Sequence, residues 1–314
     1  MSGPRVVTLI ASATEIVCAL GCESLLVGRS HECDYPPSIL DRPPCSSPRI
    51  DIVGNSREID DRVKEALKEQ WAIYDVHAEK LRALRPDVIV TQTQCEVCAV
   101  SLRDVERAMA QDLGFTTKIV PLAPNRLEDM WDDIQRVADA LGIPDRGRSL
   151  NARLQEELQQ LRIQTESFGV RPTIACVEWI DPLMMGGNWM PQLVEIAGGR
   201  SILSQVGTHS PYVTWEQLQA EDPDVIAILP CGWDIAKGRE EMAFLTQRAE
   251  WSNLRAVRNS RVYVTDGNQY FNRPGPRLVE SARIFAEILH PGEIAPLHHG
   301  TGWVRFEDPS PARV

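Results

Sequence analysis

The chain has 314 residues, which predicts two domains or one large one and excludes miniature disulfide-stapled folds. Lys and Arg number 33 against 44 Asp and Glu, and the formal charge of -11 argues against nucleic acid or an anionic membrane as a partner. No stretch approaches the roughly 18 consecutive apolar residues of a membrane span, and residues 1–10 lack the pattern of a signal peptide. The sequence therefore predicts a cytoplasmic protein whose eight cysteines are thiols or metal ligands rather than disulfides.

Strands and helices alternate along the first half of the chain. Strands are expected from the short apolar runs at residues 6–10, 25–28 and 88–90. Helices are expected after residue 11, around residues 59–67 and before residue 86. Ser12-Ala-Thr-Glu15 has the form of a capping box at the start of the first helix, and Gly21 marks the end of that helix.

A long helical pattern separates this half from the next. It runs from about residue 125 to 168, and its apolar face carries Leu150, Leu154, Leu158 and Leu161. A second alternating series follows, with a strand at 173–177, a helix at 191–197, a strand at 262–265 and a last helix at 276–289.

Two stretches of sequence in the first half recur in similar form in the second half. Residues 79–90 align without gaps on residues 216–227 at an offset of 137, with seven of twelve positions identical. Further upstream, Gly21, Ser24 and Leu26 match Gly198, Ser201 and Leu203 at an offset of 177. The sequence thus predicts an α/β fold of two related Rossmann-like lobes with parallel sheets. The expected divisions are an N-terminal lobe over 1–124 with extra residues between 28 and 78, a helical connector over 125–168, and a C-terminal lobe over 169–314.

Ligands of parallel sheets bind beyond the carboxyl ends of the strands, and a cleft between lobes is a preferred site. Cysteines gather after the predicted strands, at Cys33, Cys95, Cys98 and Cys231. Four thiolates suffice for a tetrahedral Zn site or an iron–sulfur cluster, and His31 or His209 could substitute for one of them. A purely structural role as small, partly buried thiols, and direct contact with an organic or cobalt-containing ligand, are the alternatives.

Aromatic side chains occupy the same strand-end loops: Trp179, Trp189, Trp233, Tyr270 and Phe271. Flat aromatic walls suit a large planar ligand because each ring buries much area at little cost in conformational entropy. The sequence lacks the phosphate-loop, dinucleotide-binding, HExxH and GxSxG motifs. A nucleophilic pair of Cys33 or Cys231 with His31 or His209 is conceivable, but no residue is assigned a catalytic role.

The order of several motifs resembles the periplasmic-binding-protein family that includes the cobalamin importers' binding proteins. The motifs are Ser12-Ala-Thr-Glu-Ile16, His31-Glu-Cys-Asp-Tyr-Pro-Pro37, Leu84-Arg-Pro-Asp-Val-Ile89, Gly198-Gly199, Trp215-Glu-Gln-Leu218, Asp222-Pro-Asp-Val-Ile226 and Arg273-Pro-Gly-Pro-Arg277. The resemblance implies two lobes joined by a rigid helix, small lobe motion and a ligand held between the lobes. It also implies a surface Glu on each lobe for docking on a permease, of which Glu216 matches the second.

From this resemblance we expect a protein that binds cobalamin or a related corrinoid, and from the missing signal-peptide pattern we expect it to be cytoplasmic, with a protein acceptor of the ligand as its partner. The resemblance and, for His209, the internal repeat at an offset of 177 add polar residues to the aromatic ligand contacts: His31, Glu32, Gln92, Gln94, His209, Gln269 and Arg273. The alternative is a protein with an iron–sulfur cluster, Zn or another metal on the same scaffold, with a redox or enzymatic role. A siderophore or haem binder would need cationic groups, for which Arg29 and Arg273 are the candidates.

Overall fold

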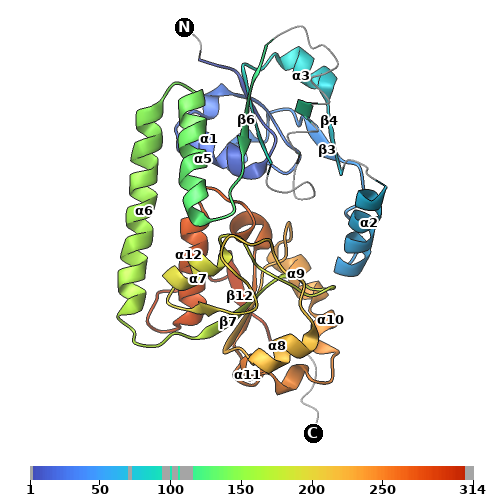
Figure 1. Cartoon of the computed structure of the whole chain (residues 1–314), viewed down its shortest axis with the longest axis vertical. Coiled ribbons are helices and arrows are strands. Elements are labelled where there is room, and N and C mark those ends of the chain that lie inside the picture. The colour runs from blue at the N-terminus through green and yellow to red at the C-terminus, as the bar shows by residue number, and fades with distance from the viewer. Residues whose placement is uncertain (1–2, 70–72, 94–99, 101–104, 107–115, 308–314) are drawn as a thin grey trace.

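The computed structural model describes residues 3–69, 73–93, 100, 105–106 and 116–307. Figure 1 shows two α/β lobes stacked along the long axis, with the long helix α6 (Pro144–Glu166) running beside both. Helix α5 (Leu127–Ala140) precedes α6, so the stretch expected to be a helical connector contains two helices. No helix among the described residues is long and apolar enough to cross a membrane.

The N-terminal lobe is built on a parallel four-stranded sheet of order β2-β1-β5-β6. Its strands are β1 (Val6–Thr8), β2 (Leu26–Arg29), β5 (Val88–Gln92) and β6 (Lys118–Leu122). Its helices include α1 (Ala11–Ala19) and α3 (Ala78–Leu84). The apolar runs recognised in the sequence are the buried centre of this sheet, since every residue of β1 and β5 is buried.

The C-terminal lobe holds a six-stranded sheet of order β12-β11-β10-β7-β8, with β9 also paired to β7. Its strands are β7 (Thr173–Trp179), β8 (Met184–Met185), β9 (Arg200–Ser201), β10 (Val225–Ile228), β11 (Val262–Thr265) and β12 (Trp303–Arg305). Its helices are α7 (Met190–Ile196), α8 (Trp215–Glu221), α9 (Ile235–Glu241), α10 (Ala243–Thr246), α11 (Arg255–Arg258) and α12 (Leu278–Leu289). The antiparallel strands β8 and β12 were not anticipated from the sequence.

The repeat seen in the sequence is a structural repeat. Helix α3 and strand β5 correspond to α8 and β10, and both helices end in a left-handed residue, Arg85 with φ 44° and Asp222 with φ 41°. The parallel order β2-β1-β5-β6 of one lobe matches β9-β7-β10-β11 of the other. The predicted two-lobed α/β class is therefore confirmed.

The extra residues of the first lobe form an arm, defined here as the described part of residues 46–76. Strands β3 (Ser46–Pro48) and β4 (Tyr74–Val76) pair antiparallel, and α2 (Ser56–Lys68) lies between them in sequence. Asn55 caps α2 in a capping box with Glu58. In Figure 1, α2 lies on the side of the molecule opposite to α6 and reaches down to the C-terminal lobe.

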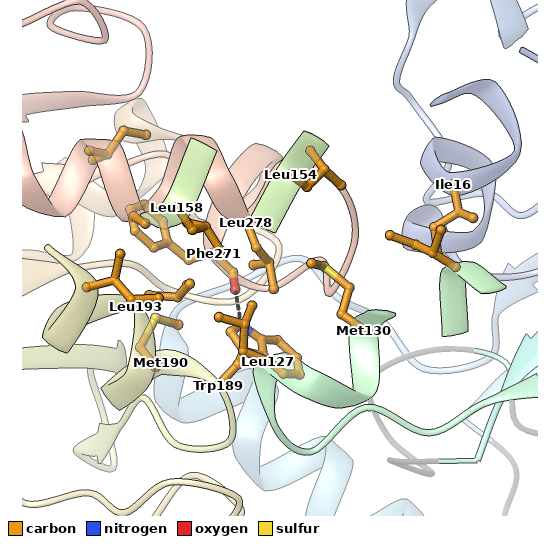
Figure 2. Packing of buried hydrophobic residues seen from close by; sticks show 14 of the residues in the cluster. Ile16, Leu127, Met130, Leu154, Leu158, Trp189, Met190, Leu193, Phe271 and Leu278 are labelled. Carbon is orange, nitrogen blue, oxygen red and sulfur yellow. Dashed lines mark hydrogen bonds between the residues drawn. The ribbon is translucent and has the colours of Figure 1, made fainter. Parts of the chain in front are cut away.

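One apolar cluster joins both lobes to α6. Figure 2 shows Leu154 and Leu158 of α6 beside Phe271 and Leu278 of the C-terminal lobe. Ile16 of α1 belongs to the same cluster. The leucine stripe of α6 therefore fixes the lobes on one side.

The expected capping box at Ser12 and Glu15 is wrong. Helix α1 begins at Ala11 and its N-cap residue, Ile10, makes no side-chain capping bond. Glu15 is instead buried, and its carboxylate accepts hydrogen bonds from Arg277 of the other lobe. A tertiary ion pair thus replaces the local hydrogen bond that the S-x-x-E spacing suggests.

Candidate ligand-binding cleft

A cleft of about 270 Å³ lies between the lobes, at the carboxyl ends of the parallel strands. Loops after β1, β2, β10 and β11 and the ends of β5 and β7 line it. The polar residues that carry the argument below are His31, Glu32, Gln92, Glu178, Cys231 and Arg273.

His31 forms part of the wall from the N-terminal lobe. Its Nδ1 shares a hydrogen bond of 2.9 Å with Oγ of Ser46, and its ring lies 5.3 Å from that of Tyr74. Burial, followed by the positive charges of His77 and Arg29, lowers the pKa of His31 to about 4. The imidazole is therefore neutral at physiological pH and held in one orientation by the arm.

Glu32 lies beside His31, and 33% of its side chain is exposed. Partial burial between the lobes removes water from the carboxyl group and raises its pKa to about 7, although Arg273 and the Tyr74 hydroxyl act in the opposite direction. The Tyr74 hydroxyl donates to Oε1 of Glu32 over 3.5 Å. Glu32 thus presents a weakly satisfied carboxyl group to the cleft.

Glu178 is the corresponding carboxyl group of the C-terminal lobe. Ser210 donates its hydroxyl to Oε1 of Glu178 over 2.9 Å, and the Gly187 amide donates to that hydroxyl over 3.1 Å. Burial raises the pKa of Glu178 to about 7. Burial, together with Glu178 and Glu32, raises the pKa of the neighbouring Cys231 thiol to about 12. Both lobes therefore contribute titratable acidic groups.

Arg273 is the one Lys or Arg among the described residues of the lining. Its Nη1 lies 2.5 Å from Asp34 and 3.5 Å from Glu15, and its Nη2 donates to Asn268 over 2.8 Å. Two carboxylates thus neutralise this guanidinium, and no unpaired cation faces the cleft in the part of the chain that the structure describes.

The four cysteines do not occupy equivalent places. Cys33 is fully buried in the core, where its thiol bonds with Thr14 and Ser30, and it does not line the cleft. Cys231 lines the cleft, and Cys95 and Cys98 lie outside the described residues. Among described side chains, no three His, Cys, Asp or Glu converge to hold a metal ion. Cys33 and Cys231 therefore lie in different surroundings, and the expected Zn or iron–sulfur site stays a prediction because Cys95 and Cys98 lie outside the described residues.

The expected aromatic wall is mostly absent from the lining. Trp189 lines the cleft and donates its indole N–H to the Phe271 carbonyl over 3.0 Å. Phe271 itself is fully buried. Trp179 and Trp233 pack on each other at 4.9 Å, and the Tyr270 ring lies 5.4 Å from the guanidinium of Arg277. These four side chains do not line the cavity; Phe271 is in the core, and the other three are partly buried against neighbouring protein groups.

Of the remaining polar residues expected to contact ligand, some line the cleft and others do not. Gln92 and His209 line the cleft, whereas Gln269 bonds to Asp34 and Arg277 beside it. Gln94 lies outside the described residues. Sequence reasoning missed Glu178 and Tyr74. Glu178 directly follows the predicted strand at 173–177, so the rule that ligands bind beyond strand ends could have identified it. Tyr74 lies in the arm, where no sequence pattern indicates a binding role.

The model of the periplasmic binding protein family matches residues 6–269. This chain belongs to that family. It is 25% identical over 286 residues to the vitamin B12-binding protein of Vibrio cholerae, covering 88% of this chain and 86% of that protein. It is 21% identical over 294 residues to an uncharacterized ABC transporter substrate-binding lipoprotein of Bacillus subtilis, covering 91% of this chain and 80% of the relative.

Solved structures of the family share the fold. The periplasmic vitamin B12 binding protein of Vibrio cholerae superposes with a TM-score of 0.65 at 21% identity, covering 91% of this chain and 96% of that one. A periplasmic heme binding protein of Pseudomonas aeruginosa gives 0.69 at 20% identity, covering 93% and 94%. The chain is thus a substrate-binding protein of a family whose named members include vitamin B12-binding and heme-binding proteins.

Proposed function

We propose that this protein binds a corrinoid in the interlobe cleft and presents it to an ABC transporter. The observation that carries the choice is the charge of the cleft. Its walls offer the carboxyl groups of Glu32 and Glu178, and Arg273, the one guanidinium among the described lining residues, is already paired with Asp34 and Glu15. Such a cleft favours a ligand that brings hydrogen-bond donors and little negative charge.

A corrinoid has these properties because its corrin ring carries primary amides around the periphery. Amide N–H groups can donate to Glu32, Glu178 and Gln92, while amide carbonyls can accept from Asn188 or Asn268, which also line the cleft. Haem instead carries two propionates, which would lie against acidic walls without a free cationic partner among the described lining residues. Like charges placed opposite each other weaken binding.

The neutral imidazole of His31 supports the same proposal. A neutral ring can hydrogen bond to an amide or contact the metal of the ligand without adding charge. Ser46 holds its Nδ1, as the outer partner of a metal-contacting histidine commonly does.

The repeat supplies a pair of residues for docking on the permease. Glu216, singled out by the family resemblance, lies in the first turn of α8, and Glu79 lies in the first turn of α3 at the repeat offset of 137. Both side chains are exposed. The proposal assigns one docking carboxylate to each lobe. The cytoplasmic location expected from the sequence stays a prediction, and the named relatives are periplasmic proteins or lipoproteins.

The test compares two corrinoids that differ in the side chains around the corrin ring. Cobinamide carries amides, whereas cobyrinic acid carries carboxylates at those positions. We expect isothermal titration to show cobinamide bound about a hundredfold more tightly, because carboxylates meet Glu32 and Glu178. Glu178→Lys should reduce that preference, and Glu157→Lys, on the exposed face of α6, should leave it unchanged. Equal affinity for the two compounds would contradict the proposal.

A further inference from the structure

The arm touches the opposite lobe through the first residue of α2. Glu241, at the end of α9, accepts hydrogen bonds from both the amide and the hydroxyl of Ser56 at 3.0 Å. Its side chain is 4% exposed, and Lys237 balances its charge at 3.1 Å. A carboxylate from one lobe therefore sits at the positive end of a helix from the other lobe.

Three further contacts surround this one. The Trp179 indole donates to the Ser56 carbonyl over 3.1 Å. Arg57 forms a two-point ion pair with Asp181 at 2.5 and 3.1 Å. The Tyr212 hydroxyl donates to Asp60 over 3.0 Å. All are polar; the Arg57–Asp181 pair is exposed and the other two contacts are partly buried, so water can replace each partner when the contact opens.

The arm also forms a wall of the cleft. Pro48, Ile52 and Tyr74 line the cavity from this side, while α6 and its apolar cluster close the opposite side of the molecule (Figure 1). The side held by α6 is packed with leucines, whereas the side held by the arm depends on these four polar contacts and on the Lys64 ammonium, which lies 4.9 Å from the centroid of the Tyr212 ring. The arm is thus the wall that can separate at the lower cost in free energy.

The size of the cleft supports such a movement. Pockets that bury drug-sized ligands have volumes of about 300–1,000 Å³, and a corrinoid is larger than those ligands. The cavity of about 270 Å³ is smaller than this range. A macrocycle therefore needs one wall of the cavity to move, and the arm is the wall held by polar contacts.

We propose that the arm is a clasp, latched by Glu241 at the start of α2, which must release for ligand to enter or leave the cleft. The proposal rests on the corrinoid function for the identity of the ligand, but the latch itself consists of contacts within this chain and can be measured without ligand. Opening exposes the Ser56 amide and moves Ile52 and Tyr74 away from the cavity. Closing returns them and covers the ligand on the side opposite to α6.

The test uses Glu241→Ala and its neighbour Glu240→Ala as the matched control. Glu240 lies on the same helix and is 71% exposed, and its contact is with Lys237 rather than with the arm. Hydrogen exchange of the backbone amides at residues 56–59 measures, without ligand, how often the contact between Ser56 and Glu241 opens. Stopped-flow mixing with cobinamide measures the rates of ligand association and release. Tyr212→Phe, which removes one exposed hydroxyl, serves as a second variant that keeps the core intact.

For Glu241→Ala we expect about tenfold faster exchange at these amides and about tenfold faster ligand release, the effect of losing a helix cap. Tyr212→Phe should change both in the same direction by a smaller factor, and Glu240→Ala should change neither. Unchanged exchange in Glu241→Ala and Tyr212→Phe would overturn the latch, and faster exchange with unchanged ligand rates would overturn its control of ligand passage. Faster exchange in a protein that binds no corrinoid would leave the latch standing and defeat the proposed ligand instead.

Discussion

Glu15 and Arg277 form a buried two-point ion pair between residues that lie 262 positions apart in the chain. Arg277 Nη2 lies 2.5 Å from Oε1 of Glu15, and its Nε donates to Oε2 over 2.9 Å. Arg273 approaches the same carboxylate at 3.5 Å. Because Glu15 belongs to the first lobe and both arginines to the second, this cluster sets the relative orientation of the cleft walls.

Removing this carboxylate should destabilise the protein strongly. Glu15→Gln leaves two guanidinium groups without their shared buried partner, and breaking such a pair costs about 3–5 kcal/mol. Urea unfolding measures the difference. Glu157→Gln, which breaks an exposed pair with Arg153 on α6, should cost less than about 0.5 kcal/mol. A cost below about 1 kcal/mol for Glu15→Gln would mean that the pair does not hold the lobes together.

Corrinoid affinity should rise between pH 6 and pH 8. Burial raises the pKa of Glu32 and of Glu178 to about 7, so both carboxyls lose their protons in this range and become better acceptors for amide donors. Titration calorimetry at several pH values measures the effect, and Glu178→Gln should flatten it. An affinity that falls as pH rises would contradict the assigned role.

The same groups should make the ligand-free protein less stable as pH rises from about 4.5 to 7. A carboxyl whose pKa is higher in the folded state than in the unfolded state binds its proton more tightly when folded, so stability is lost as the proton leaves. Thermal unfolding at pH 8 should therefore show a higher midpoint for Glu178→Gln than for the wild type. A lower midpoint would show that ionised Glu178 stabilises the fold.

His298 should stabilise the C-terminal lobe below neutral pH. Hydrogen bonds to Glu280 and Glu287 raise its pKa to about 9, and Glu287 also accepts from the Trp303 indole. The stabilisation is complete below pH 6.5 and is lost as pH rises toward 9. His298→Gln should thus lower the unfolding midpoint more at pH 6 than at pH 9.5. An equal drop in the unfolding midpoint at pH 6 and pH 9.5 would show that the positive charge of His298 does not stabilise the fold.

Docking on a permease should depend on Glu79 and Glu216 together. Reversing both charges should abolish transporter-dependent corrinoid uptake while leaving corrinoid affinity unchanged, because neither residue lines the cleft. Vesicle uptake and calorimetry measure the two properties separately. Reversing Glu166, at the end of α6, provides the control. Uptake that survives the double reversal would place the docking surface elsewhere.

The repeat and the strand–helix alternation sufficed to predict the fold, because both arise from local backbone preferences that recur at fixed spacing. The site was harder to predict. His31, Glu32 and Cys33 are consecutive, yet the first two side chains line the cleft and the third points into the core. Adjacent residues in a loop differ in direction, and no pattern in the sequence specifies which of them faces a cavity. The partner of Glu15 and the latch at Glu241 depend on contacts between lobes, so local motifs could not indicate them.

The most direct test of the proposed ligand is a parallel titration with cyanocobalamin and with hemin, combined with elemental analysis of protein purified without oxygen. The acidic cleft predicts that cyanocobalamin binds at least about tenfold more tightly than hemin. It also predicts that the purified protein contains no iron with acid-labile sulfide. Tighter binding of hemin, or stoichiometric iron and sulfide, would contradict the corrinoid assignment.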